Sequence, residues 1–183
     1  MRARFCSACG GRLGRGRPPG DERERLICQR CGTVHYENPK IVVGSLCRYR
    51  GRLLLCRRAI EPQAGLWTLP AGFLELGESA EEGAVREAFE EARARIAIER
   101  LFAVYSIPHI GQVQLFYTAR LLSPEVAPGP ESAEVGLFEP RAIPWDRLAF
   151  PSVRRALARA VEGWEGTDPI RETLGPHALR RKA

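Results

Sequence analysis

The sequence predicts an α/β fold with a mixed sheet and helices on both of its faces, preceded by a small cysteine-rich module. Two Cys-x2-Cys pairs lie near the N-terminus, and strand-like segments alternate with two helical segments after residue 40. The 183 residues leave room for one ordinary domain and one small module. We therefore divide the chain into a module over 1–37, a main domain over 38–165 and a polar C-terminal tail over 166–183.

Four of the six cysteines are paired at short spacing, Cys6 with Cys9 and Cys28 with Cys31. Each pair ends in a glycine-bearing turn, and the stretch between the pairs, GRLGRGRPPGDERER, is too polar to bury a core. Four thiolates satisfy tetrahedral Zn²⁺ and leave no open position, so the pattern predicts a structural zinc ribbon. A redox-active Cys-x2-Cys pair is the alternative. We expect the nearby His35 to be a surface or packing residue.

The segments after the module predict a hairpin and then a helix. Residues 36–40 (YENPK) form a linker, because the proline prevents regular strand pairing. IVVGSLCRYRGRLLLCRRA predicts two strands that turn at Arg50-Gly51. GLWTLPAGFLELGE is an irregular extended segment. It leads into a helix over Ser79–Ala92, which Ser79 and Glu82 begin with a capping-box pattern.

The second half of the chain predicts more strands and a second helix. The strand candidates are Ile96–Ile98, Leu101–Ile107 and Gln112–Leu122. A proline-rich loop (PEVAPGPESAEV) follows, and then a segment with a short strand and a turn (GLFEPRAIPWDRLAF). Ser152–Trp164 has apolar residues on one helical face and predicts an amphipathic helix. The segment from Glu165 onward is polar, and we expect it to be loosely ordered.

The first helix carries an unusual acidic side. Glu87, Glu90 and Glu91 are spaced i, i+3 and i+4, so their carboxylates project from one side of the helix and repel one another. A hard divalent cation such as Mg²⁺ removes this cost, because it binds carboxylate oxygens together with phosphates and waters. Arg86 lies at helical spacing from Glu82 and Glu90 and can orient the carboxylates. The alternative is an ordinary solvated acidic face.

The whole stretch from Gly72 to Ala94 resembles the Nudix box, G-x5-E-x7-R-E-U-x-E-E-x-G-U. Its positions are filled here by Gly72, Glu78, Arg86, Glu87, Ala88, Glu90, Glu91 and Ala94. One position departs, because Arg93 stands where the family has its last glycine. That glycine normally lets the chain leave the helix in a left-handed turn, so Arg93 puts the local exit geometry in doubt.

The resemblance extends over roughly residues 5–160, in segments such as FCSACGG, ENPKIVVG and GLWTLPAGFLELGES. The chain is similar to the zinc-ribbon branch of the Nudix hydrolases. Within it, the chain resembles the group that includes the plastid FAD pyrophosphatase of plants and ADP-ribose pyrophosphatases. The resemblance implies an α/β/α sandwich and nucleoside diphosphate substrates linked to another group. It also implies Mg²⁺, or Mn²⁺, held by Glu87, Glu90, Glu91 and the Gly72 carbonyl.

Catalysis by such a site needs a general base as well as a metal. Glu134 and Glu131 are the candidates, because they lie in the PGPESAEV loop, where many family members place a functional glutamate. An ordinary turn glutamate remains the alternative for either residue. The catalytic set that we predict is therefore Glu90, Glu91, Glu87, Arg86 and Glu134.

The substrate is predicted from the segment after the box. NADH pyrophosphatases carry an SQPWPFP-like signature there, whereas this chain has SIPHIGQ, which resembles the FAD and ADP-ribose group. We expect hydrolysis of FAD to FMN and AMP, of ADP-ribose, or of both. NADH or another dinucleotide is the alternative. A non-catalytic nucleotide-sensing regulator that binds nucleic acid is a further alternative, although such proteins usually lose box carboxylates that this chain keeps.

Four side chains are candidates for substrate binding: Arg57, Trp67, Phe73 and Pro108. The aromatic rings could stack on a flavin or adenine ring, and the guanidinium could reach the phosphates. Pro108 lies near the place where ADP-ribose hydrolases carry a marker proline. Packing in the core or solvation at the surface is the alternative for each. Further candidates of the same kinds are Arg58, Tyr105 and His109.

Charge and composition limit the partners. The net charge of +6 permits attraction to phosphorylated molecules, but the arginines are spread along the chain without a long basic run. We therefore do not expect nucleic acid as a partner. No apolar signal segment follows MRARFCSACGG, and the apolar runs are too short to span a bilayer, so we expect a cytoplasmic protein without a membrane partner. Homodimerisation stays open, as does a binding role for the ribbon.

Overall fold

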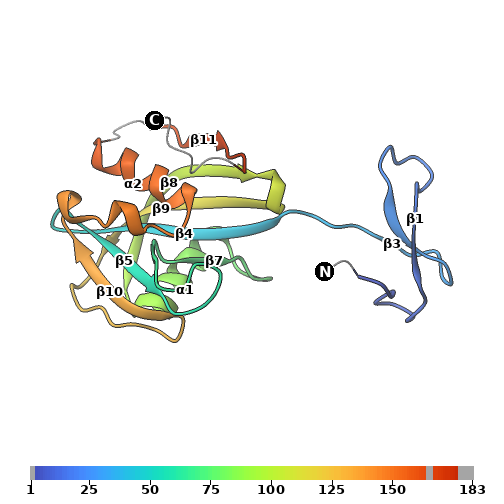
Figure 1. The fold of residues 1–183 in the computed structure, drawn as a ribbon, viewed down its shortest axis with the longest axis horizontal. Coiled ribbons are helices and arrows are strands. Elements are labelled where there is room, and N and C mark those ends of the chain that lie inside the picture. Colours follow the sequence, from blue (N-terminus) through green and yellow to red (C-terminus); the bar gives the residue numbers. More distant parts are fainter. Residues whose placement is uncertain (1–2, 164–166, 177–183) are drawn as a thin grey trace. The chain divides into compact units, whose positions relative to one another are not determined.

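A computed structural model of the chain describes residues 3–163 and 167–176. The chain separates into two compact units, Met1–Asn38 and Pro39–Ala183 (Figure 1). Each unit has its own sheet, and each is described by itself.

The first unit is a three-stranded antiparallel sheet of β1 (Leu13–Gly16), β2 (Arg25–Cys28) and β3 (Val34–His35). Its two cysteine turns are built alike. Gly10 donates its N–H to the Cys6 carbonyl at 2.9 Å, and Gly32 donates to the Cys28 carbonyl at 3.0 Å. Both glycines have φ near +72°, a conformation that costs other residues about 1–2 kcal/mol. The glycine after each cysteine pair is therefore required by the turn.

The second unit is built on a mixed sheet with the strand order β10-β5-β4-β9-β8-β11. The β4/β9 and β8/β11 pairs are parallel and the other neighbours are antiparallel, and the short strands β6 and β7 pair with β5 and β4. The strands are β4 (Lys40–Tyr49), β5 (Arg52–Arg58), β6 (Trp67–Thr68), β7 (Ala71–Phe73), β8 (Ile96–Ile107), β9 (Gln112–Leu121), β10 (Ser132–Phe138) and β11 (Ile170–Thr173).

Helices α1 (Ala80–Ala92) and α2 (Pro151–Val161) cover opposite faces of this sheet (Figure 1). Successive side chains of a strand point to opposite faces, so β4 serves both helices. Val43 packs with Ala84 of α1, whereas Leu46 belongs to the larger core that contains Val153 and Leu157 of α2. The predicted α/β/α sandwich with a mixed sheet is thereby confirmed.

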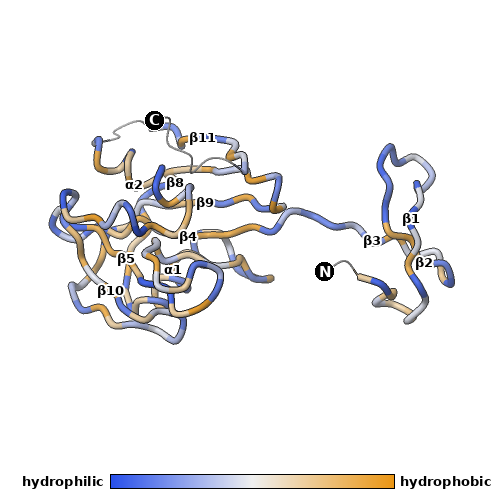
Figure 2. The backbone as a smooth tube through the Cα atoms, viewed as in Figure 1, coloured by the Kyte–Doolittle hydropathy of each residue, from blue (hydrophilic) through white to orange (hydrophobic). Residues whose placement is uncertain are grey.

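Hydropathy follows this layering. The tube of the second unit is mostly orange along the central strands and blue in the connecting loops (Figure 2). Among the described residues, no helix has the length and apolar character that crossing a membrane would require.

The structure differs from the predicted elements at three places. The segment from Ile96 to Ile107 is one strand, because two irregularities in its register with β9 absorb the polar residues that suggested a break. Strand β10 begins inside the predicted proline-rich loop. Strand β11 lies in the predicted tail 166–183, where pairing with β8 orders it. The second helix ends at Val161, before the expected end at Trp164, which itself lies outside the described residues.

Short 3-10 turns connect the later elements. They are η1 (Pro108–Ile110), η2 (Pro140–Ala142) and η3 (Trp145–Arg147).

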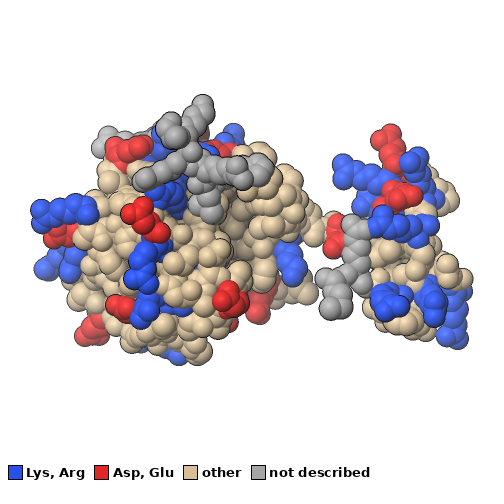
Figure 3. All heavy atoms as spheres, in the orientation of Figure 1, with Lys and Arg blue, Asp and Glu red and all other residues tan. Residues whose placement is uncertain are grey.

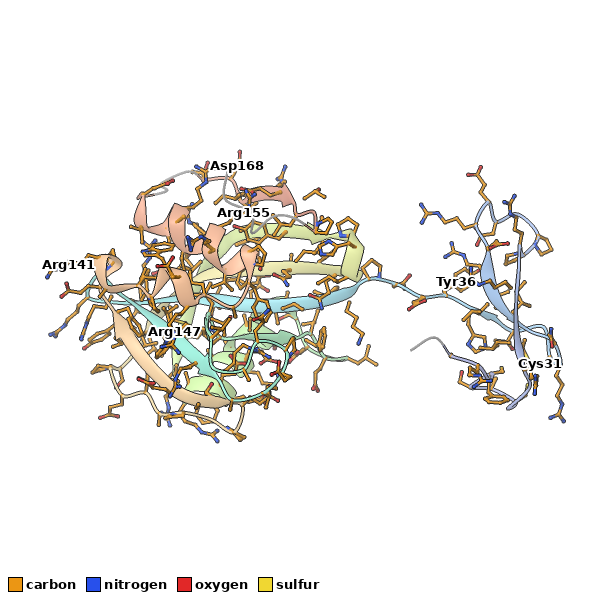
Figure 4. All side chains as sticks on the ribbon, viewed as in Figure 1. Cys31, Tyr36, Arg141, Arg147, Arg155 and Asp168 are labelled. Carbon is orange, nitrogen blue, oxygen red and sulfur yellow. The ribbon has the colours of Figure 1, made fainter. Side chains whose placement is uncertain are left out.

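Two polar contacts hold β11 and the residue after it in place. Arg155 of α2 donates to the Glu172 carboxylate at 2.6 Å (Figure 4), and the Leu174 N–H donates to the Ser106 carbonyl at 2.8 Å. The segment after β11 is thus held against the end of β8.

Candidate active site

A cavity of ≈ 920 Å³ opens in the second unit, where α1, the sheet and the N-terminus of α2 meet. One part of its wall is charged and comes from α1, the end of β5 and the loop before β10: Arg58, Arg86, Glu87, Glu90, Glu91 and Glu131. Another part is mostly apolar and comes from the sheet, α2 and the segment after β11: Val42, Ile107, Phe116, Phe150, Val153 and Leu174. The cavity is large enough for a nucleotide-sized ligand.

Local interactions set where α1 begins and ends. Ser79 accepts a hydrogen bond from the Glu82 N–H at 3.2 Å, and the Glu82 carboxylate accepts one from the Ser79 N–H at 2.7 Å, which forms the predicted capping box. At the other end, Arg93 adopts the left-handed conformation with φ +52°. The exit geometry that the family's glycine provides is therefore kept, and an arginine carries the strain.

Arg86 ties the acidic residues together. Its guanidinium donates to the Glu78 carboxylate at 2.8 and 3.0 Å, to Glu87 at 2.7 Å, to Glu90 at 2.9 Å and to the Phe73 carbonyl at 3.0 Å. The bonds from Arg86 to Glu78 lower the pKa of Glu78 to about 2, with a further contribution from the backbone N–H of Glu75. Arg86 therefore fixes where the carboxylates point and partly balances their charge.

Glu87 and Glu91 are buried carboxylates, with exposed fractions of 8% and 5%. Burial raises the pKa of Glu91 to about 8, although a hydrogen bond from the Ala71 N–H at 3.1 Å opposes the shift. Burial also raises the pKa of Glu87, against the opposing effect of Arg86. Burial therefore disfavours the ionised forms of both side chains.

Gly72 is required by the approach of Glu87. A Cβ placed on Gly72 would overlap the Glu87 carboxylate, so every other residue would displace that carboxylate. The glycine that begins the box thus lets the buried carboxylate lie directly against strand β7.

The two glutamates of the later loop have different positions. Gly129 packs so closely on α1 that an added Cβ would overlap the Glu90 carbonyl, and its N–H donates to the Glu91 carbonyl at 3.0 Å. This contact brings Glu131 to the cavity wall. Glu134 is instead paired with Arg57 at 2.9 Å, and neither residue lines the cavity. Glu131 therefore lies at the cavity and Glu134 does not, and which of the two acts as a base stays a prediction.

The substrate-binding candidates are likewise separated. Phe73 lines the cavity with 49% of its side chain exposed. Trp67 is in the core, where its ring meets Phe138 edge-on at 4.9 Å, and it is not available for stacking. Arg58 lines the cavity in place of Arg57, because adjacent residues of β5 face opposite sides. Its guanidinium lies over the Phe150 ring at 5.2 Å.

The specificity segment also differs in detail. Ile107, His109 and Ile110 line the cavity, whereas Pro108 begins η1 and does not. Tyr105 is fully buried in the hydrophobic core, in edge-on contact with Phe116. We find no stacking role for Tyr105.

Sequence reasoning missed three parts of the wall. These are the amides of Gln112 and Gln114, the N-terminus of α2 at Phe150–Val153, and the segment Leu174–Pro176. Alternation along QVQLF could have indicated that the two glutamines share one face of β9. The other two parts depend on long-range packing, for which the sequence has no local pattern.

The four cysteines of the first unit converge on one point, and Cys31 is labelled in Figure 4. Sulfur–sulfur distances are 3.3 Å for Cys9–Cys31, 3.4 Å for Cys9–Cys28 and 3.8 Å for Cys6–Cys31. A tetrahedron with Zn–S bonds of about 2.3 Å has edges of about 3.8 Å. The cluster therefore fits the predicted ligand set. His35 is close to it as well, with Nε2 3.2 Å from the Cys6 sulfur.

A group of three or more Cys, His, Asp or Glu side chains whose ligand atoms all lie within 4.8 Å of one another could hold a metal ion. Among the described residues, the four thiols form the one such group. In the described part of the chain, no three carboxylates of α1 bring their oxygens this close to one another, although one Arg86 nitrogen donates to both Glu87 and Glu90.

The class of protein follows from this combination: a cysteine-ribbon module joined to an α/β/α domain in which one helix places buried carboxylates at the wall of a nucleotide-sized cavity. Family models agree, since residues 4–37 match the Nudix N-terminal family and residues 38–160 match the NUDIX domain. The chain belongs to the Nudix hydrolase family and is a Nudix hydrolase with a zinc-ribbon module.

Three similar proteins illustrate the relationship. A NUDIX hydrolase from Nitrosomonas europaea, known by its crystal structure, is 44% identical with a TM-score of 0.90, over 94% of this chain and 99% of that one. An ADP-ribose pyrophosphatase of Methanocaldococcus jannaschii is 30% identical over 63% of this chain and 69% of that protein. The NAD-capped RNA hydrolase NudC of Stutzerimonas stutzeri is 30% identical over 85% of this chain, which spans 53% of that protein. The closer likeness to the plant FAD pyrophosphatase stays a prediction.

Proposed function

We propose that this chain hydrolyses the diphosphate of an ADP-linked substrate in a reaction that depends on a divalent cation, with ADP-ribose as the preferred substrate and FAD as the next. The observation that carries the proposal is the cavity itself. It joins a buried, charged section on α1 to an apolar section of a size and character suited to a base.

The acidic section fits Mg²⁺ or Mn²⁺. Burial disfavours the ionised forms of Glu87 and Glu91, and a divalent cation would offset that cost. We assign the cation to the carboxylates of Glu87, Glu90 and Glu91 and to the Gly72 carbonyl, because Gly72 lines the same cavity. When bound, the cation supplies charge neutralisation for the diphosphate and lowers the pKa of a coordinated water.

The remaining steps are assigned to the chain's own residues. Arg86 holds Glu87 and Glu90 in position through its hydrogen bonds and is a positioning residue. Glu131 accepts the proton of the attacking water, because it lines the cavity whereas Glu134 is engaged by Arg57. Arg58, beside the charged section, would bind a phosphate oxygen. Phe73, half exposed at the rim, would pack on the substrate.

The substrate assignment is supported by the relatives. The Methanocaldococcus jannaschii protein bears the name ADP-ribose pyrophosphatase, and SIPHIGQ stands where NADH pyrophosphatases carry their signature. The NudC relative supports a second candidate, an NAD-type dinucleotide, because it matches 85% of this chain. Both candidates contain ADP, so they share the nucleotide half and differ in the other half.

Product analysis tests the proposal. The purified chain is incubated with ADP-ribose, FAD, NADH or diadenosine polyphosphates, with Mg²⁺ or Mn²⁺ or with EDTA. We expect metal-dependent release of AMP, with kcat/KM higher for ADP-ribose or FAD than for NADH. The highest kcat/KM on NADH would favour the second candidate, and no hydrolysis of any ADP-linked compound would overturn the proposal.

We also propose that the first unit binds one structural Zn²⁺ through Cys6, Cys9, Cys28 and Cys31. The thiol spacing supports it, and four protein ligands leave no position for a substrate.

A further inference from the structure

The apolar section of the cavity wall contains a pair of glutamine side chains to which the proposed chemistry assigns no role. Gln112 and Gln114 lie two residues apart on β9, so both point to the cavity face of the sheet. The Gln114 side-chain amide Nε2 donates to the Gln112 side-chain oxygen Oε1 at 3.1 Å. The Gln114 carbonyl oxygen is buried and has no hydrogen-bond partner among the described residues.

A buried acceptor without a partner is costly, and the cost disappears when a ligand donates to it. The pair presents two groups to the cavity: the Gln114 side-chain oxygen, which accepts, and the Gln112 amide nitrogen, which donates. An acceptor beside a donor is complementary to a heterocycle whose edge has an amino group beside a ring nitrogen. Adenine has such an edge, and glutamine amides are well suited to it.

The surroundings of the pair fit a planar base. Ile107 is the β8 partner of Gln112 and therefore lies beside it, and Phe116 follows Gln114 on the same face of β9. Both belong to one hydrophobic cluster with Val153 and Leu174, and all four line the cavity. The amide pair is thus a polar feature in an otherwise apolar part of the wall.

The distance from the acidic section also fits. Phe73, Val42 and Gln114 are successive partners across β7, β4 and β9, so they form one row on the sheet. Two strand spacings separate Gln114 from Phe73, which is roughly 10 Å. Phe73 follows Gly72, against which the Glu87 carboxylate lies. A ribose can bridge a base at Gln114 and a diphosphate at α1.

We infer that Gln112 and Gln114 form the subsite that recognises the adenine of the substrate, with the Gln114 carbonyl oxygen accepting a hydrogen bond from the 6-amino group. The inference rests on the proposed function, because an ADP-linked substrate is what brings adenine into the cavity. It makes Gln114 a specificity residue for the base and assigns it no part in the chemical step.

Binding of AMP tests this inference without turnover. The informative analogue is purine riboside 5′-monophosphate, because it lacks the 6-amino group that the Gln114 side-chain oxygen would accept a hydrogen bond from. Isothermal titration should give a Kd for AMP about tenfold below that for the analogue, as expected for one hydrogen bond. In Gln114→Leu the ratio should fall to about one. Gln114→Met, which also lacks the acceptor, replaces it if the leucine variant does not fold.

The control is Thr118→Val, which changes a buried polar residue of the same strand that does not line the cavity and should keep the AMP preference. Equal wild-type Kd values for AMP and the analogue, or a preference that survives in Gln114→Leu, would overturn the inference. So would FMN binding that depends on Gln114 while AMP binding does not, since the pair would then bind the flavin. Hydrolysis of ADP-ribose is assayed separately. If AMP binds selectively but ADP-ribose is not hydrolysed, the proposed function is wrong and the adenine subsite stands. If ADP-ribose is hydrolysed but AMP and the analogue bind equally, the proposed function stands and the adenine subsite is wrong.

Discussion

Glu91 is the residue whose burial has the most direct thermodynamic consequence. Its pKa in the folded protein is about 8, above the ordinary 4.5, so the folded state binds the proton more tightly than the unfolded state. Without a divalent cation, the free energy of unfolding is therefore largest below about pH 4.5 as far as Glu91 is concerned. It decreases as the pH rises towards 8.

We predict that Glu91→Gln raises the Tm of the metal-free protein at pH 8, because the neutral amide removes a buried charge. Each kcal/mol gained in the free energy of unfolding raises the Tm by about 2–4 °C in a domain of this size. The gain should shrink at pH 5 and be reversed in saturating Mg²⁺, where the wild type gains a ligand. Differential scanning calorimetry at the two pH values measures this. Glu81→Gln, on the exposed side of the same helix, is the matched control and should change little.

The individual residues were predictable to different degrees. Spacing alone placed Glu87, Glu90 and Glu91 on one side of a helix, and the structure brings all three to the cavity. Spacing could not decide between Arg57 and Arg58 or between Glu131 and Glu134. Those choices depend on which face of β5 is buried and on how closely Gly129 packs against α1.

At the scale of elements, the end of α1 is where the chain departs from its family's pattern. Arg93 takes a left-handed conformation, which costs an L-residue roughly 1–2 kcal/mol. Part of this cost is offset where its guanidinium lies over the Phe89 ring at 5.3 Å.

We expect Arg93→Gly to raise the free energy of unfolding by about 0.5–1 kcal/mol, because glycine adopts this conformation without strain. Urea unfolding followed by circular dichroism measures the difference. Arg95→Gly serves as the comparison, since Arg95 is exposed and does not have a positive φ, and it should lose stability. If Arg93→Gly is destabilising, the strain at the helix exit has been overestimated.

Elements with local signals were well predicted, and elements formed by long-range pairing were not. The capping box and the recurring alanines identify α1 without any knowledge of the fold. Strand β11 has no comparable signal, because its four residues become a strand by pairing with the free edge of β8. The same holds for β10, whose start lies in a loop-like sequence.

At the scale of the whole molecule, each unit depends on a different source of stability. Charged side chains of both signs are interspersed on the visible face of the second unit (Figure 3), which has a large apolar core. The first unit has a three-stranded sheet and few buried side chains, so it needs another source of stability. In small modules a structural zinc contributes on the order of 10 kcal/mol of apparent binding energy.

We predict one tightly bound zinc per chain in elemental analysis of the purified protein. Cys28→Ser should lose the zinc and unfold the first unit while the second unit keeps its cooperative transition. Cys47→Ala is the matched control, because Cys47 is buried in the core of the second unit and should leave the zinc content unchanged. A wild-type protein without stoichiometric zinc would contradict the assignment of the cysteine cluster.

The central claim is that the acidic side of α1 is the catalytic centre, and the turnover of Glu90→Gln tests it most directly. Glu90 is more exposed than Glu87 and Glu91, so its loss should leave the fold and the zinc content intact. Charge stabilisation at a metal site is worth several kcal/mol, and each ~1.4 kcal/mol is tenfold in rate. With ADP-ribose and saturating Mg²⁺, kcat should fall by at least about a hundredfold, whereas Glu81→Gln should retain it. A folded Glu90→Gln protein with near-wild-type, metal-dependent kcat would contradict the claim.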